Sequence, residues 1–309
     1  MRYLHLDVFT DTPLEGNQLA VFPDPPRDIS PALMQRIAAE MNFSESTFVF
    51  PREANGDVRM RIFTPGEELP MAGHPTVGST FALAAERVIV EGRTDFVFEL
   101  GVGPTPVSLE WKDGCLQFVW MTQGLPSFGP AMDPALLARP LGLEASDIVP
   151  TLPAQPVSCG VRFLFVALAS REAVDRVSID RRAFASACRA AGVDELPVFL
   201  FTTDRRGGDE AVYSRMLAPG FGITEDPATG GACGPLGCYL FHHGVFDARR
   251  VRMFVNLQGV AMRRPSRISI SIDTEGDRIT RVRVGGQAVI LGEGEINLQL
   301  LTPNSQIRS

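Results

Sequence analysis

The chain has 309 residues, a formal net charge of −7 and a hydrophobic fraction of 45%. That length fits one large domain or two of medium size, and the hydrophobic fraction is typical of a protein with a well-buried core. Its basic residues are scattered, whereas a nucleic acid or an anionic membrane requires clustered positive charge. We therefore expect neither as a partner.

Cysteine and histidine usage predicts a cytoplasmic protein without a bound metal or cofactor. The five cysteines are widely spaced and form no Cys-x-x-Cys pair, which argues against a disulfide framework and favours a reducing compartment. None of the four histidines has the spacing of a zinc site, and no glycine-rich nucleotide loop is present. The apolar runs fall far short of the roughly 20 residues that cross a bilayer, and the start of the chain lacks a secretory signal.

Strands dominate the predicted secondary structure. Short segments rich in β-branched and aromatic residues are separated by Gly, Pro, Asn and Asp, as in sheet proteins. The predicted strands are 3–9, 18–22, 46–50, 58–63, 95–99, 105–110, 115–121, 163–168, 198–202, 212–217, 251–256, 266–272, 278–284, 287–291 and 296–300.

Helices are few. One is predicted over residues 31–41, with Ser30 as its N-cap and Pro31 in its first turn. Others are predicted to begin at Asp133 and near Asp180. Strands and helices do not alternate regularly, so the pattern indicates an α+β fold with mostly antiparallel sheets. A Pro- and Gly-rich stretch at 122–134 is the predicted linker between two domains, 1–125 and 126–295.

An internal repeat supports the division into two halves. The pattern Arg, two apolar residues, one variable residue, Pro-Gly occurs at 61–66 and again at 215–220. The pattern Glu-x-Pro-x-x-Gly follows each copy, at 68–73 and 225–230. Both elements recur after about half the chain, which is typical of two copies of one structural unit. The shared Glu68 and Glu225 are predicted to brace the turn in each half.

A buried helix is predicted after each repeat. The segments that follow Gly73 and Gly230 are rich in small residues and apolar almost all round, as in a helix that is buried on every side. Each half is therefore predicted to be a sheet rolled around one central helix. The N-terminus of such a helix offers unpaired N–H groups and partial positive charge to a carboxylate. The glycines Gly73, Gly230 and Gly231 leave the backbone accessible there.

Three titratable side chains are candidate catalytic residues. His74 lies in the first turn of the first central helix, and Asp226 lies in the matching turn of the second half. Glu45 lies between a helix end and a strand, among Phe43, Phe48 and Phe50. A carboxyl group that these rings desolvate would have a raised pKa, suitable for a general base.

Five motifs occur in a fixed order along the chain. They are Asp7-Val-Phe-Thr10, Gly16-Asn-Gln-Leu-Ala-Val-Phe22, Asn42-Phe-Ser-Glu-Ser-Thr47, Glu68-Leu-Pro-Met-Ala-Gly-His-Pro-Thr76 and Glu225-Asp-Pro-Ala-Thr-Gly230. With these motifs the chain resembles the PhzF family of phenazine-biosynthesis isomerases over nearly its whole length. The resemblance implies the diaminopimelate-epimerase-like fold, with two pseudo-symmetric domains and the C-terminal segment 296–309 returning to the first.

The resemblance also implies a chemistry and a set of roles. The reference reaction of the family isomerises trans-2,3-dihydro-3-hydroxyanthranilate without a cofactor, and its members are commonly homodimers. Glu45 would be the acid/base that moves the proton on a small carboxylate substrate. The substrate-binding residues would be Gly73, His74, Thr229, Gly230 and Gly231, with Asp226 beside them. Gly231 is a departure, because family members often have Ser at this position, which leaves the reference substrate open.

Two other functions stay open on the sequence. Related amino-acid racemases and epimerases use a Cys at each helix turn, but here those positions are Ala72 and Thr229. Cys233 lies farther into the second helix, where a packing role is expected. The third possibility is a metabolite-binding protein that keeps the fold without turnover, and the missing hydroxyl at Gly231 is the one feature that favours it.

Overall fold

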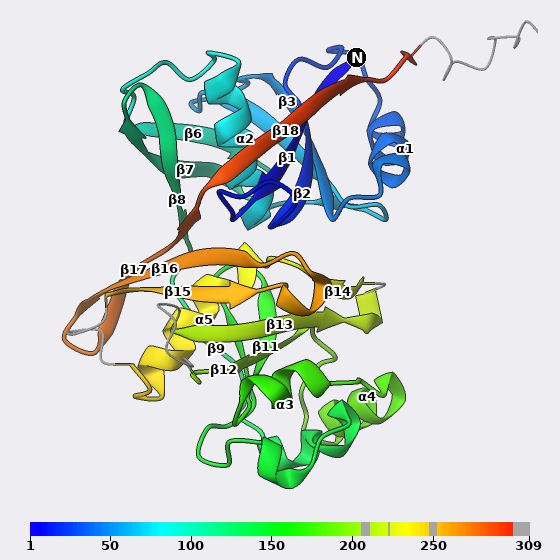
Figure 1. The fold of residues 1–309 in the computed structure, drawn as a ribbon, viewed down its shortest axis with the longest axis vertical. Coiled ribbons are helices and arrows are strands. Elements are labelled where there is room, and N and C mark those ends of the chain that lie inside the picture. Colours follow the sequence, from blue (N-terminus) through cyan, green and yellow to red (C-terminus); the bar gives the residue numbers. More distant parts are fainter. Residues whose placement is uncertain (205–210, 222, 247–251, 299–309) are drawn as a thin grey trace, which may run out of the picture. The chain divides into compact units, whose positions relative to one another are not determined.

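The computed structural model describes residues 1–204, 211–221, 223–246 and 252–298, and it divides into two compact units (Figure 1). Unit 1 comprises Met1–Leu14, Gln18–Val119 and the segment from Gln287 onward. Unit 2 comprises Glu15–Asn17 and Trp120–Gly286. Among the described residues, no helix is long and apolar enough to cross a membrane.

The described part of unit 1 contains helices α1 and α2, strands β1 to β7, most of β8, and β18. Strand β8 begins in this unit and ends in unit 2. The elements are β1 (Arg2–Val8), β2 (Asn17–Phe22), α1 (Pro31–Met41), β3 (Glu45–Pro51), β4 (Val58–Phe63), β5 (Glu68–Leu69), α2 (Gly73–Ala85), β6 (Asp95–Leu100), β7 (Gly103–Lys112), β8 (Cys115–Gln123) and β18 (Ala288–Glu295).

Unit 2 has the remaining strands and three α-helices. Its elements are β9 (Ser127–Phe128), the 3₁₀ turns η1 (Pro134–Leu137), η2 (Arg139–Leu141) and η3 (Ala145–Asp147), β10 (Gln155–Ser158), β11 (Arg162–Ala167), α3 (Arg171–Arg176), α4 (Arg181–Ala190), β12 (Val198–Thr202), β13 (Val212–Ala218), η4 (Pro219–Phe221), β14 (Ile223–Asp226), α5 (Gly230–His242), β15 (Met253–Gln258), η5 (Val260–Met262), β16 (Ser266–Glu275) and β17 (Arg278–Gly286).

The two units repeat one order of strand pairing. In unit 1, β2–β3 is parallel, β3–β4 and β4–β5 are antiparallel, β4–β6 is parallel and β6–β7 is antiparallel. In unit 2 the same sequence runs β11–β12 parallel, β12–β13 and β13–β14 antiparallel, β13–β15 parallel and β15–β16 antiparallel. The predicted α+β fold of two pseudo-symmetric units is confirmed.

A buried helix lies against the inner face of the sheet in each unit. Helix α2 contacts β1, β3 and β18, and α5 contacts β10, β11, β16 and β17. Glycines allow this close packing: a Cβ on Gly78 would lie 2.6 Å from side-chain atoms of Leu19 and Val8, and one on Gly237 would lie 2.7 Å from Ile270. The small residues of the two segments therefore allow each helix to be buried within its sheet, as the sequence predicted.

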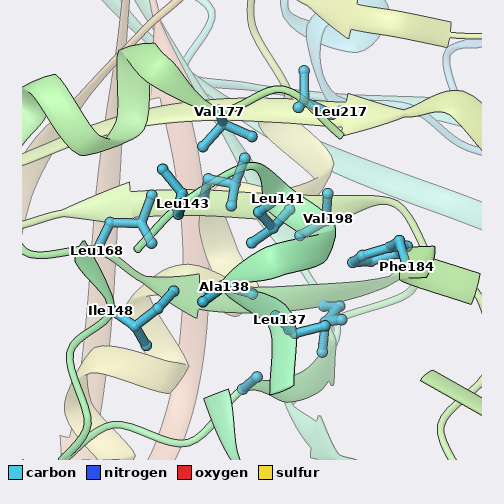
Figure 2. Packing of buried hydrophobic residues seen from close by; sticks show 14 of the residues in the cluster. Leu137, Ala138, Leu141, Leu143, Ile148, Leu168, Val177, Phe184, Val198 and Leu217 are labelled. Carbon is cyan, nitrogen blue, oxygen red and sulfur yellow. The ribbon is translucent and has the colours of Figure 1, made fainter. Parts of the chain in front are cut away.

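The outer faces of the sheets carry separate apolar layers. In unit 1, α1 packs Met34, Ile37 and Ala38 against Phe22 and Phe48. Ser30 caps this helix as predicted, accepting a hydrogen bond from the Leu33 N–H. In unit 2, a larger apolar cluster joins the 3₁₀ turns, α3 and α4 to β11–β13. Its labelled members in Figure 2 are Leu137, Ala138, Leu141, Leu143, Ile148, Leu168, Val177, Phe184, Val198 and Leu217.

Some predicted boundaries need correction. The helix expected at Asp133 is a pair of 3₁₀ turns, because Pro140 interrupts the segment and Gly142 ends it in the left-handed conformation. Helix α3 was not predicted. The chain crosses between units along strand β8 rather than in a loop at 122–134, and it returns at Gln287, before 296, because β18 pairs with β1. The end of the strand expected at 296–300 lies outside the described residues.

Candidate active site

An Arg–Glu pair braces the turn before each central helix. In unit 1, Arg61 of β4 donates two hydrogen bonds to Glu68 of β5, at 2.7 and 2.6 Å. In unit 2, Arg215 of β13 donates two to Glu225 of β14, at 2.9 and 2.8 Å. Such planar two-point pairs fix both side chains geometrically. The bracing role predicted for the repeated glutamates is confirmed.

Neither central helix is capped by the side chain of its N-cap residue. The N-cap of α2 is Ala72, which has no hydrogen-bonding side chain, and the Thr229 side chain at the N-cap of α5 makes no cap bond. In contrast, Ser30, Ser170 and Asp180 cap the other α-helices. The ends of α2 and α5 thus retain N–H groups suited to an anionic ligand.

Glu45 and His74 come together at the N-terminus of α2. Glu45 begins β3 with its side chain 15% exposed, and one carboxylate oxygen lies 3.2 Å from Nδ1 of His74. Thr47 lies on the same face of β3, where its hydroxyl is 2.9 Å from that of Ser79 in α2. Side chains alternate along a strand, so the carboxyl group points toward the central helix.

The phenylalanines expected around Glu45 are on the other side of the sheet. Phe48 packs against α1 and Phe22, and Phe43 and Phe50 contact the same outer cluster. The surroundings of Glu45 are therefore set by His74 and the helix end, not by Phe43, Phe48 and Phe50. The expectation failed because it did not account for the two-residue alternation of the strand.

His74 is held as a neutral imidazole by burial. Its side chain is 4% exposed, and this desolvation lowers the pKa of the imidazole from 6.5 to about 3. Nε2 lies 3.3 Å from the carbonyl oxygen of Gln18, which can only accept, so Nε2 carries the proton. The lone pair of Nδ1 then faces the Glu45 carboxyl group. Nδ1 can accept a hydrogen bond from Glu45 when the carboxyl group is protonated.

At the N-terminus of α5, hydrogen bonds fix Asp226. Its Oδ1 accepts from the Asn17 amide at 2.9 Å, and its Oδ2 accepts from the Thr229 hydroxyl at 2.6 Å. Thr229 is only 9% exposed. Its hydroxyl donates to Asp226. The substrate-binding role of Thr229 stays a prediction.

Sequence reasoning missed Asn17 and Gln258. Asn17 lies within a motif that was recognised, but the motif did not show that its amide also donates to the Ala228 carbonyl at 3.1 Å. Gln258 is fully buried and bonds to Thr229 through both amide atoms. A glutamine at the end of a strand is usually exposed, so no local signal indicated this one.

The backbone glycines of α5 differ in the space around them. A Cβ on Gly231 would meet only the ring edge of Phe163, at 3.9 Å, whereas one on Gly234 would lie 2.0 Å from Oε1 of Gln123. Gln123 also donates to the Gly230 carbonyl at 2.9 Å, which anchors the first turn. Gly231 therefore has room for a side chain.

The thiols are poorly placed for proton transfer. Cys233 is fully buried within α5, and its burial raises the pKa of the thiol far above its usual value. The helix turns have Ala72 and Thr229 at the positions where two-thiol racemases need cysteines. Within the described part of the chain, His, Cys, Asp and Glu side chains form no group of three that could hold a metal ion.

Known proteins match the chain over nearly its whole length. The family model described as phenazine biosynthesis-like protein matches residues 6–294. Trans-2,3-dihydro-3-hydroxyanthranilate isomerase of Pseudomonas aeruginosa is 38% identical over 298 residues, which cover 96% of this chain and 99% of the relative.

The chain belongs to the PhzF family. Three relatives that are 36–38% identical over nearly the full length are named trans-2,3-dihydro-3-hydroxyanthranilate isomerase, and this PhzF-family protein is accordingly an isomerase. A crystal structure of a PhzF-family protein from Bacillus anthracis matches with a TM-score of 0.84 at 27% identity, over 96% of this chain and 99% of that one. A probable proline racemase from Agrobacterium radiobacter shares the fold, with a TM-score of 0.66 at 13% identity over 98% and 94% of the two chains.

Proposed function

We propose that this isomerase moves a proton between two carbons of a small carboxylate, with Glu45 as the acid and base and with no metal or pyridoxal phosphate. The reaction type would be that of trans-2,3-dihydro-3-hydroxyanthranilate isomerase. The observation that carries the proposal is the contact of 3.2 Å between Glu45 and the neutral, buried His74. After Glu45 has taken up a proton, its carboxyl group needs a hydrogen-bond acceptor, and Nδ1 of this neutral imidazole is one.

The proton movement uses only these groups. The Glu45 carboxylate takes a proton from one carbon, and the C–H electron pair moves into the conjugated system of the substrate. The neutral Glu45 carboxyl group then donates a hydrogen bond to Nδ1 of His74 until it returns the proton to a second carbon. One C–H bond breaks and one forms, so no oxidant or reductant is needed.

The two helix ends would supply the electrostatic part of the site. Preorganised N–H donors at uncapped helix N-termini stabilise a carboxylate and the negative charge that develops on removal of the proton. In this proposal Gly73 of α2 and Gly230 and Gly231 of α5 contribute those donors. Asp226 would accept a hydrogen bond from an amino or hydroxyl group of the substrate.

The direct test is an assay of the purified chain with trans-2,3-dihydro-3-hydroxyanthranilate in D2O. We expect an isomer of the substrate, detected by chromatography, and incorporation of solvent deuterium, detected by mass spectrometry. Stabilisation of the protein by substrate without isomer or deuterium would instead support a binding protein that lacks turnover. Inactivation by iodoacetamide, with protection by substrate, would instead indicate a thiol epimerase.

We also propose a cytoplasmic homodimer. Cys159, Cys188, Cys233 and Cys238 are free and buried, which fits a reducing compartment. Light scattering of the purified protein measures the oligomeric state directly, and a monomer mass would contradict the dimer.

A further inference from the structure

The buried Gln258 amide contacts three groups of the second motif. Its Oε1 accepts from the Thr229 N–H at 3.1 Å, and its Nε2 donates to the Asp226 carbonyl at 2.8 Å and to the Thr229 hydroxyl at 2.9 Å. The residue is at the end of β15 and has no exposed surface. A buried amide with every bond directed at one turn holds that turn in a single conformation.

The direction of these hydrogen bonds determines how the Asp226 carboxylate is held. Because Nε2 of Gln258 donates to Oγ1 of Thr229, that hydroxyl uses its own proton for Oδ2 of Asp226, at 2.6 Å. Oδ1 of Asp226 accepts from the Asn17 amide. Both carboxylate oxygens are thus acceptors, which favours the ionised form and one orientation of the side chain.

We propose that Gln258 is a positioning residue of the isomerase, which orients Asp226 toward substrate through the Thr229 hydroxyl. The inference rests on the proposed function, because it assigns Asp226 to substrate binding. In this scheme Thr229 does not contact substrate. Gln258 orients the Thr229 hydroxyl, and this hydroxyl in turn orients Asp226. Because the hydroxyl donates to Asp226, it does not cap the N-terminus of α5.

Gln155 provides a matched control in the same unit. It is also a buried glutamine, 7% exposed, whose Nε2 donates to the Gly129 carbonyl at 2.9 Å and whose Oε1 accepts from Nε2 of His243 at 2.8 Å. These two hydrogen bonds go to residues outside the motif. Loss of its amide measures what removal of a buried glutamine does to the fold of unit 2.

The experiment compares Gln258→Met, Gln258→Glu and Gln155→Met with the wild type. We expect Gln258→Met to lower kcat/KM by about tenfold to a hundredfold, because a misplaced binding group costs up to that much, while Gln155→Met keeps kcat/KM. A carboxyl group at position 258 donates only when it is protonated. The ratio of Gln258→Glu to wild-type kcat/KM should therefore rise as the pH falls, an effect that a purely structural glutamine would not produce.

A second readout does not depend on turnover. In carbon-13 NMR of labelled protein, the titration of the Asp226 carboxyl group should move to higher pH in Gln258→Met and stay unchanged in Gln155→Met. If both Gln258 variants match the Gln155 variant in kcat/KM and in the Asp226 titration, the inference is wrong. If the wild type itself shows no turnover, the proposed function fails, and the titration alone then decides whether Gln258 controls Asp226.

Discussion

The N-termini of the two central helices share a backbone plan but carry different chemistry. At α2, Glu45 is partly exposed, and one of its carboxylate oxygens lies 3.2 Å from Nδ1 of the neutral His74 imidazole. At α5, Asp226 accepts hydrogen bonds from the Asn17 amide and the Thr229 hydroxyl. The two helix ends thus differ in the side chains around them, and in the proposed mechanism α2 is the proton-transfer end and α5 is the binding end.

The two Arg–Glu bracing pairs also differ, because the pair in unit 2 is less exposed and makes more hydrogen bonds. Arg61 and Glu68 have side chains 16% and 40% exposed, whereas those of Arg215 and Glu225 are 11% and 12% exposed. Arg215 also donates to the Val174 and Asp175 carbonyls, both at 3.0 Å, at the end of α3. Arg215 therefore ties the turn before α5 to the surrounding fold by more hydrogen bonds than Arg61 gives the turn before α2.

The largest expected effect is at the proton-transfer end. Glu45→Gln keeps the size of the side chain and removes its ability to take a proton, so kcat should fall by about 10²- to 10⁴-fold. Exchange of substrate hydrogen for solvent deuterium, measured by mass spectrometry, should fall with it. The affinity for substrate should change little.

Glu40→Gln is the control for this variant. Glu40 lies on the exposed face of α1 in the same unit, and its loss should leave exchange unchanged. Full deuterium exchange in Glu45→Gln would remove Glu45 from the mechanism. It would also contradict the assignment of proton transfer to the N-terminus of α2.

The second prediction concerns the bracing pairs. Arg215→Met leaves Glu225 buried without its partner, and the free energy of unfolding should fall by about 3–5 kcal/mol. Arg61→Met should cost about 1 kcal/mol or less, because Glu68 is far more exposed and water can replace the arginine. Urea denaturation of both variants measures the difference. Equal losses would contradict the view that unit 2 holds its turn more rigidly.

The third prediction uses the pH dependence of stability. The pKa of His74 is about 3 in the folded protein and about 6.5 when unfolded, so the unfolded state binds the proton first as the pH falls. This group therefore gives no penalty above pH 6.5 and destabilises the fold by up to about 5 kcal/mol as the pH falls toward 3.

His74→Gln should flatten this part of the curve, since glutamine does not titrate. Unfolding curves measured between pH 7 and pH 4 for the variant and the wild type test the point. His243→Gln is the control, because His243 is less buried than His74 and lies at the C-terminal end of α5, away from α2 in the sequence. Parallel pH profiles of the wild type and His74→Gln would show that the imidazole is not held neutral.

How much the sequence predicted depended on the range of the interaction. The central helices and the cap at Ser30 follow from residues close in the chain, and the structure has them. The pairing of Glu45 with His74 joins two motifs that were recognised separately. The role of Gln258 depends on β15 lying beside the turn at Asp226, a contact that no local pattern encodes.

The smallest expected effect is at Gly231. Because a Cβ there would meet only Phe163, at 3.9 Å, Gly231→Ser should change the free energy of unfolding by about 0.5 kcal/mol or less. Gly237→Ala should be far more costly, since its Cβ would lie 2.7 Å from Ile270 in the packed core. Thermal unfolding of both variants checks the contrast within one helix.

The same variant also tests what the open space at Gly231 does for substrate choice. A serine hydroxyl at this position would add one hydrogen-bonding group beside the uncapped end of α5, where we place the substrate carboxylate. The ratio of kcat/KM values for trans-2,3-dihydro-3-hydroxyanthranilate and for an analogue without its hydroxyl group should then shift toward the hydroxylated compound. Identical ratios for Gly231→Ser and the wild type would mean that substrate does not reach this part of α5, and the binding end would need to be sought elsewhere in unit 2.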